Sequence, residues 1–144
     1  MNKMCRLFLA ACCILAISGC ATQVDVYPRY DGLYYKQFEG FTMYFLFFNE
    51  YRVINANTDG RRDISIMNWF NRNFTENQGT YSIDGKRINF YVESEQGRVE
   101  FNGTVTRHKR GRPGGEKMKL RMNSLINGKK MQIYLKFLPD EVKR

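Results

Sequence analysis

Cysteine is missing from most of this 144-residue chain. All four cysteines lie within the first twenty residues, at positions Cys5, Cys12, Cys13 and Cys20. Residues 21–144 therefore form no disulfide with one another and offer no thiolate ligand to a metal ion. A domain built from those residues has to be stabilised by its hydrophobic core.

The motifs of catalysis are missing as well. The single histidine, His108, has no acidic residue near it in sequence to orient it as a base. The glycines of 111–115 lack the strand–loop–helix setting of a phosphate site, and we find no nucleophile motif and no cluster with metal-ligand spacing. We interpret Glu93, Glu95 and Glu100 as a solvated surface. The sequence thus predicts a protein that is not an enzyme and has no cofactor and no metal site.

The N-terminal segment has the form of a signal peptide. Lys3 and Arg6 give a short positive region, and residues 7–17 form an almost unbroken apolar run. This run is much shorter than the roughly 20 residues needed to span a bilayer. It ends in Ile17-Ser18-Gly19-Cys20. This stretch resembles the lipobox of bacterial lipoproteins.

The lipobox resemblance implies a specific maturation. Cleavage falls between Gly19 and Cys20, a diacylglycerol is attached to the Cys20 sulfur, and the new amine is acylated, for example with palmitate. The lipid on Cys20 then binds the protein to a membrane. Ala21 in place of an aspartate implies the outer membrane, facing the periplasm, in a Gram-negative organism. The alternative is an ordinary secretory signal that is cut elsewhere and leaves Cys20 unmodified.

The chain after the leader divides into three parts. Residues 20–31 are polar, contain one proline and show no periodicity, which indicates a lipidated N-terminus and tether. The alternative for the second half of this segment is an arm docked on the domain. Residues 32–138 form the folded domain, and 139–144 form a C-terminal tail.

Within residues 32–138, alternating apolar and polar residues indicate β-strands. We predict eight, at 32–36, 41–48, 51–57, 79–83, 87–93, 99–106, 118–123 and 131–137. Most of the connections are short, and Asp84-Gly85 and Asn127-Gly128 are typical of tight hairpin turns. Sequential neighbours then pair antiparallel. The prediction is an all-β fold with one short helix, an eight-stranded antiparallel up-and-down barrel without exposed edges.

Residues 64–72 break the strand pattern and predict a helix. Met67, Trp69 and Phe70 lie at roughly helical spacing. This helix either plugs a barrel end or covers the outer face of the 41–48 strand. We interpret Trp69, the only tryptophan, as a packing residue.

Several of these segments together resemble the lipocalin-like small lipoproteins of bacteria. They are Gly32-Leu33-Tyr34, the Phe- and Tyr-rich hairpin after it, the helix around Trp69, and the residues of 79–85 and 88–90. The similarity covers most of residues 31–138. It implies a lipocalin-like barrel, although Gly32-x-Tyr34 stands where lipocalins usually have Gly-x-Trp.

Large residues are predicted to face the barrel interior. They either fill it or leave room for a small hydrophobic ligand, since methionine adapts its shape. The candidate lining residues are Met43, Phe45, Phe90, Phe101, Met118, Met122, Met131 and Phe137.

Positive charge is the other marked feature, with a net charge of +9. It concentrates in the 107–121 hairpin. This hairpin is either a solvated tip or a contact for anionic lipid, glycan or an acidic partner. The candidate contact residues are Arg107, Lys109, Arg110, Arg112 and Lys117. An exported, anchored protein is not expected to bind nucleic acid.

The leading hypothesis is a membrane-anchored, non-catalytic binding module of the cell envelope that holds a small hydrophobic ligand. It predicts a cavity that opens beside the 64–72 helix. One alternative is a structural or partner-binding envelope protein that acts through the 107–121 hairpin. Another is an inhibitor of an exported hydrolase.

Overall fold

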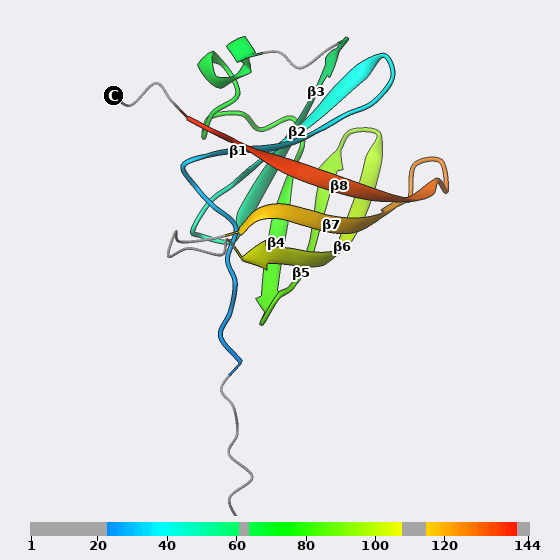
Figure 1. The fold of residues 1–144 in the computed structure, drawn as a ribbon. Coiled ribbons are helices and arrows are strands. Elements are labelled where there is room, and N and C mark those ends of the chain that lie inside the picture. The colour runs from blue at the N-terminus through cyan, green and yellow to red at the C-terminus, as the bar shows by residue number, and fades with distance from the viewer. Residues whose placement is uncertain (1–22, 61–63, 108–114, 141–144) are drawn as a thin grey trace, which may run out of the picture.

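The computed structural model describes residues 23–60, 64–107 and 115–140. Eight strands follow one another around a closed antiparallel barrel, and β8 pairs with β1 (Figure 1). They are β1 (Gly32–Gln37), β2 (Phe41–Phe47), β3 (Arg52–Asp59), β4 (Gln78–Asp84), β5 (Arg87–Ser94), β6 (Gly97–Arg107), β7 (Gly115–Ser124) and β8 (Lys130–Pro139). The predicted all-β, eight-stranded antiparallel barrel is confirmed.

Aromatic side chains fill the middle of the barrel. Phe45 is fully buried, and its ring meets those of Phe90 and Phe101 edge-on, at centroid distances of 5.5 and 5.2 Å. Phe90 and Phe101 stack on each other at 4.7 Å. The alternation of β2, β5 and β6 turns these residues inward because side chains on a strand point to opposite faces in turn. The interior at this level is a packed core.

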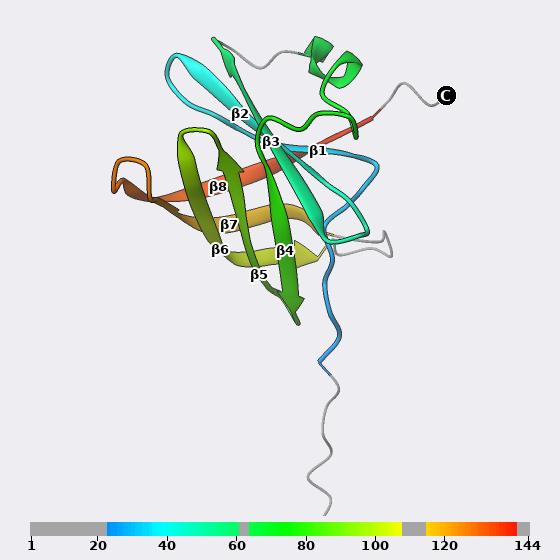
Figure 2. The same ribbon diagram turned by 180° about the vertical axis from the view of Figure 1, so that it is seen from behind.

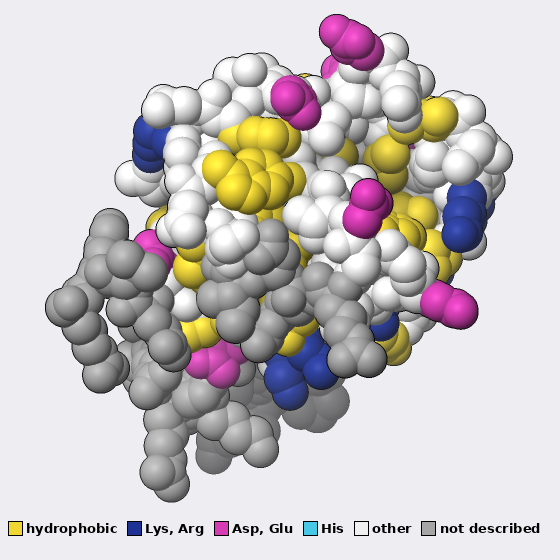
Figure 3. All heavy atoms as spheres, turned by 90° about the horizontal axis from the view of Figure 1, so that it is seen from above, with side chains coloured by type: hydrophobic (Ala, Val, Ile, Leu, Met, Phe, Trp, Pro, Cys, Tyr) yellow, Lys and Arg dark blue, Asp and Glu magenta, His cyan; other side chains and the backbone are white. Residues whose placement is uncertain are grey.

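The outer face of β1–β3 is covered by the chain between β3 and β4. Ile66 and Phe70 of this connection are buried in a hydrophobic cluster with Tyr44 and Ile54, which strand alternation places on the outward face. Figure 2 shows the course of this connection, from the end of β3 back to the start of β4. Strand β2 is therefore covered on both faces, as its apolar sequence requires. Seen from above, the surface carries separate groups of hydrophobic side chains with carboxylates between them (Figure 3).

The helix predicted at 64–72 is shorter and of a different kind. The structure has a 3-10 helix, η1, over Ile64–Asn68, followed by turns. The asparagines of this segment favour turns because their side chains compete for backbone groups, as Asn71 does by accepting a hydrogen bond from the Asn73 N–H. Trp69 contacts Phe70 and Phe74 but remains 44% exposed. In the part of the chain that the structure describes, no helix has the length and apolar character to cross a membrane.

The barrel wall opens between β3 and β4. The two strands pair only over Arg52–Ile54 and Gln78–Thr80, whereas β3 continues beside β2 as far as Asp59. The last bond across this seam runs from the Asn55 N–H to the Asn77 carbonyl, at 2.9 Å. Beyond this bond, β3 lies opposite the turn between β5 and β6, and no backbone pairing joins the two. This leaves space at this end of the barrel.

Candidate ligand site at one end of the barrel

The opposite end of the barrel is closed by the N-terminal arm, residues 23–31. Val26 is 5% exposed and belongs to the barrel core, and its N–H donates to the Gly85 carbonyl at 2.7 Å. The Gly115 N–H donates to the carbonyl of Tyr27 at 3.0 Å. Of the two interpretations of this segment, a docked arm therefore describes its second half. The arm leaves the barrel on the side away from the β1–β2 turn (Figure 1).

Arg29 completes this closed end. Its guanidinium lies 4.1 Å from the centre of the Phe137 ring and forms ion pairs with Asp31 at 2.6 Å and Glu116 at 3.1 Å. Its backbone N–H donates to the Tyr34 hydroxyl at 2.8 Å, and this hydroxyl donates to the Gly115 carbonyl. Phe137, predicted as a lining residue, thus packs at the closed end.

Burial raises the pKa of Tyr34 well above its ordinary value of about 10, and burial followed by the hydrogen bond to Tyr30 does the same for Tyr81. A raised folded-state pKa means that the folded protein holds its proton more tightly. The stability that this pKa difference contributes is fully present below about pH 10, the pKa in the unfolded chain. It is lost as the pH rises toward the pKa of the folded state.

We therefore expect the free energy of unfolding to fall above about pH 10, by up to about 1.4 kcal/mol per pH unit from Tyr34. Urea unfolding at a series of alkaline pH values measures this slope. Tyr34→Phe should flatten it, whereas Tyr134→Phe, at a residue that is 54% exposed, should leave it unchanged. Equal slopes for wild type and Tyr34→Phe would contradict the assignment.

At the open end lies an apolar well of about 260 Å³. Four of the predicted lining residues, Met43, Phe101, Met122 and Met131, are among those that line it. The rest of its wall is Phe38, Phe41, Asn55, Asn57, Val92, Val99, Ser124, Asn127 and Lys129. The barrel interior is thus filled at its middle and hollow at one end.

The other predicted lining residues do not reach this space. Phe45 and Met118 are buried in the core and are absent from the lining of the well. Phe90 is likewise buried, and the aromatic packing with Phe45 and Phe101 holds it below the floor. Large rings at the centre separate the well from the closed end.

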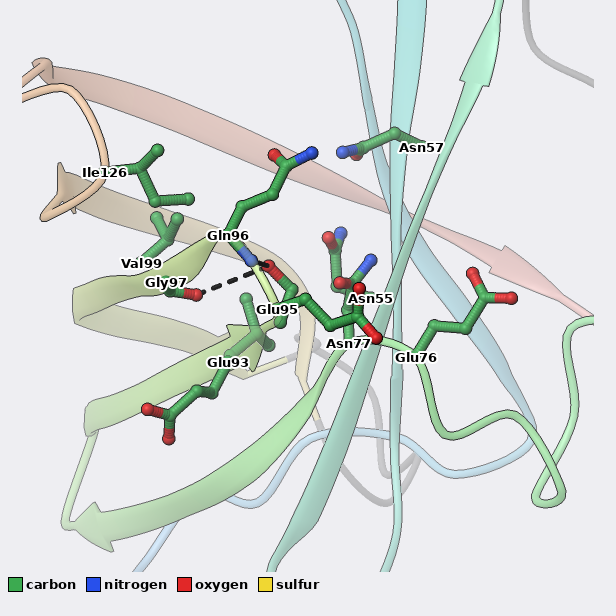
Figure 4. A pocket seen from close by; sticks show the side chains of 12 residues that line it. Asn55, Asn57, Glu76, Asn77, Glu93, Glu95, Gln96, Gly97, Val99 and Ile126 are labelled. Carbon is green, nitrogen blue, oxygen red and sulfur yellow. Dashed lines mark hydrogen bonds between the residues drawn. The ribbon is translucent and has the colours of Figure 1, made fainter.

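A wider polar mouth of about 620 Å³ continues the well outward. The two spaces share four lining residues, Asn55, Asn57, Val92 and Val99. Asn57 of β3 and Gln96 of the β5–β6 turn point toward each other across the opening (Figure 4). The mouth is completed by Glu76, Asn77, Glu93, Ser94, Glu95, Gly97 and Ile126.

The predicted position of the opening beside residues 64–72 is wrong. That segment packs on the outer face of β1–β3 and supplies no residue to the well or the mouth. The opening instead follows from the short β3–β4 pairing. Among the described residues of this connection, only Glu76 and Asn77, which come just before β4, contribute to it.

Two polar side chains of the well are almost completely buried. Asn55 and Ser124 are each 5% exposed. The Asn55 amide nitrogen donates to the Tyr44 carbonyl at 2.9 Å. Sequence reasoning missed both residues, although the polar pair Asn55 and Asn57 follows Val53 on the inward face of β3 and interrupts its apolar alternation.

The basic hairpin is described only at its base. Arg107 ends β6 opposite Gly115 at the start of β7, and Gly115 also bonds the N-terminal arm. Lys117 is exposed on β7. Lys109, Arg110 and Arg112 lie outside the described residues, as does His108. The hairpin base therefore lies at the closed end, away from the well.

Comparisons with protein-family models, with curated proteins and with solved structures find no match. Among residues 23–60, 64–107 and 115–140, no group of three His, Cys, Asp or Glu side chains is placed to hold a metal ion. The arrangement of the open end offers an apolar floor, amide groups and carboxylates. Groups of these kinds can hold a small molecule through burial and hydrogen bonds.

Proposed function

We propose that this protein is a lipid-anchored envelope protein that binds a small amphipathic molecule at the open end of its barrel. The observation that carries the proposal is the continuity of the apolar well with the polar mouth. Binding sites for small molecules are typically concave and mostly apolar, with a few convergent polar groups. The opposite end, by contrast, is closed by the arm, Arg29 and Tyr34.

The size of the well limits the ligand. Its volume of about 260 Å³ lies just below the range of roughly 300–1,000 Å³ that is typical of ligand sites. Phe45 and Phe90 fill the barrel below it, so a long acyl chain does not fit lengthwise. A short chain or a single ring fits, with its polar end in the mouth.

The anchor in this proposal is the lipid on Cys20, which the lipobox-like Ile17-Ser18-Gly19-Cys20 supports. The arm that follows Cys20 docks at the closed end of the barrel. A membrane attached through this arm lies on the closed side. The β5–β6 turn, whose Gln96 lines the mouth, lies at the other end of the barrel from the arm (Figure 1). A ligand then reaches the mouth from the aqueous side.

Blocking the mouth tests the binding function. Val99 lines both the well and the mouth, so Val99→Trp should fill the passage between them. The fluorescent probe is N-phenylnaphthylamine, whose single phenyl ring matches the size of the well while its naphthyl group would lie in the wider mouth. We expect Val99→Trp to weaken binding of this probe at least about tenfold, a loss of roughly 1.4 kcal/mol in binding free energy. Fluorescence titration of full-length protein in nanodiscs, corrected for empty nanodiscs, measures this.

The matched control is Tyr134→Trp, which adds the same side chain at an exposed position of β8. It should bind the probe as wild type does. Thermal unfolding of each variant confirms that the barrel is intact. Unchanged probe binding in a folded Val99→Trp variant would contradict the proposed site.

A further inference from the structure

We infer that the mouth selects amphiphiles whose polar end is a cationic hydrogen-bond donor, such as an ammonium group, with the apolar part in the well. This inference rests on the proposed function and names the class of ligand. Three observations support it: the orientation of Asn55, the hydroxyl of Ser124, and the distribution of charge around the mouth.

Asn55 presents an acceptor to the cavity. Its amide nitrogen is committed to the Tyr44 carbonyl, because a carbonyl oxygen accepts and the amide NH₂ donates. The amide oxygen is then left on the cavity side, and no described residue donates to it. Asn55 is 5% exposed and lines both the well and the mouth. A buried acceptor of this kind is best satisfied by a donor that enters the cavity.

Ser124 supplies a second polar group within the well. It is also 5% exposed, and its backbone N–H donates to the Lys129 carbonyl at 2.8 Å. Its hydroxyl, which can accept or donate, bonds to none of the described residues. The well therefore holds two nearly buried polar side chains whose remaining hydrogen-bonding capacity is available to an occupant.

The charge at the mouth is negative, although the protein as a whole carries +9. Glu76, Glu93 and Glu95 line the mouth, and no lysine or arginine is among the described residues that line it. The Glu93 carboxylate forms an ion pair with the Arg98 guanidinium at 3.0 Å and points away from the opening (Figure 4). Glu95 instead extends over the opening toward Asn77 (Figure 4). Neither Glu76 nor Glu95 pairs with a cation among the described residues.

These groups distinguish three kinds of polar end. A cation is attracted by Glu76 and Glu95 and can donate to the Asn55 amide oxygen. A neutral hydroxyl gains the hydrogen bond without the attraction. A carboxylate offers no donor and meets two carboxylates at the rim. Among the described residues that line the well, Lys129 is the one cation. The structure therefore favours the cation first and the anion last.

Three eight-carbon ligands of matched chain length test this order: octylammonium, octanol and octanoate. Full-length protein in nanodiscs is titrated with each at neutral pH and low salt. Amide NMR signals of Asn55, Ser124 and Val99 report occupancy of the mouth and well, so partition into lipid is not counted as binding. We expect octylammonium to bind about three- to tenfold more tightly than octanol, because each exposed charge contributes modestly, and octanoate to bind most weakly.

Charge-neutralising variants complete the test. Glu95→Gln and Glu76→Gln should each lower the octylammonium-to-octanol affinity ratio by about twofold. Asp84→Asn makes the same charge change at the exposed β4–β5 turn, outside the well and the mouth, and should leave the ratio unchanged.

Each outcome separates the two proposals. If octanoate binds as tightly as octylammonium, or if the ratio is the same in wild type and both glutamine variants, the inference about the cationic end is overturned while the ligand site stands. If none of the three ligands shifts the mouth signals, both are overturned.

Discussion

Truncation of Phe45 to alanine is expected to lower the free energy of unfolding by about 3–5 kcal/mol. Phe45 is fully buried and contacts the rings of Phe90 and Phe101 edge-on. Its removal forfeits the transfer free energy of the ring and leaves a cavity that rigid neighbours cannot close. Edge-to-face aromatic pairs contribute about 0.5–1.5 kcal/mol beyond the buried area, and two are lost.

Urea unfolding followed by circular dichroism measures this loss. The control is Tyr134→Ala, which removes an aromatic ring from an exposed position and should change stability by about 0.5 kcal/mol or less. A Phe45→Ala protein within about 1 kcal/mol of wild type would mean that the middle of the barrel is not the packed core described above.

Replacing Cys20 with serine should abolish lipid attachment completely. Serine has no sulfur to form the thioether with diacylglycerol. Each buried methylene contributes about 0.8 kcal/mol to membrane binding, so loss of two or more acyl chains removes stable anchoring. Metabolic labelling with palmitate, together with the mass of the N-terminal peptide, measures both attachment and cleavage after Gly19.

Cys13→Ser is the matched control because it makes the same chemical change within the apolar run of the leader. It should be labelled and cleaved as wild type is. Labelling that persists in Cys20→Ser would place the lipid elsewhere. Absence of any label in wild type would remove the anchor from the proposed function.

Most of the barrel could be predicted from local sequence. In β5, Ile88, Phe90 and Val92 alternate with polar residues, and Asp84-Gly85 marks the turn before them. This pattern fixes which face is buried, and short turns then fix antiparallel pairing. The eight strands follow from such local signals, with boundaries that differ by a few residues.

The closed end could not be predicted in the same way. Arg29 pairs with Glu116, which lies 87 positions away in the chain, and Val26 bonds Gly85 across the barrel end. The polar composition of residues 21–31 carries no periodicity that would reveal these contacts. The sequence of this segment indicates a tether, but its second half docks on the barrel through residues that are distant in sequence.

The open end was only partly predictable. Alternation turns Met43, Phe101, Met122 and Met131 inward, but it does not tell whether an inward residue fills space or borders it. Whether an inward residue fills or borders space depends on the length of the pairing between β3 and β4. This pairing ends at Ile54 and Gln78. The sequence favours a solvated surface for Glu93 and Glu95, because their position at the mouth depends on this pairing and not on local pattern.

Native mass spectrometry of the protein, purified gently from the cells that make it, tests ligand binding at the open end most directly. Wild type should carry one additional small molecule per barrel, and the folded Val99→Trp variant should lack it. The same spectrum tests the proposed lipid on Cys20 by its mass. Identical ligand content in wild type and Val99→Trp would contradict a binding site formed by the well and the mouth.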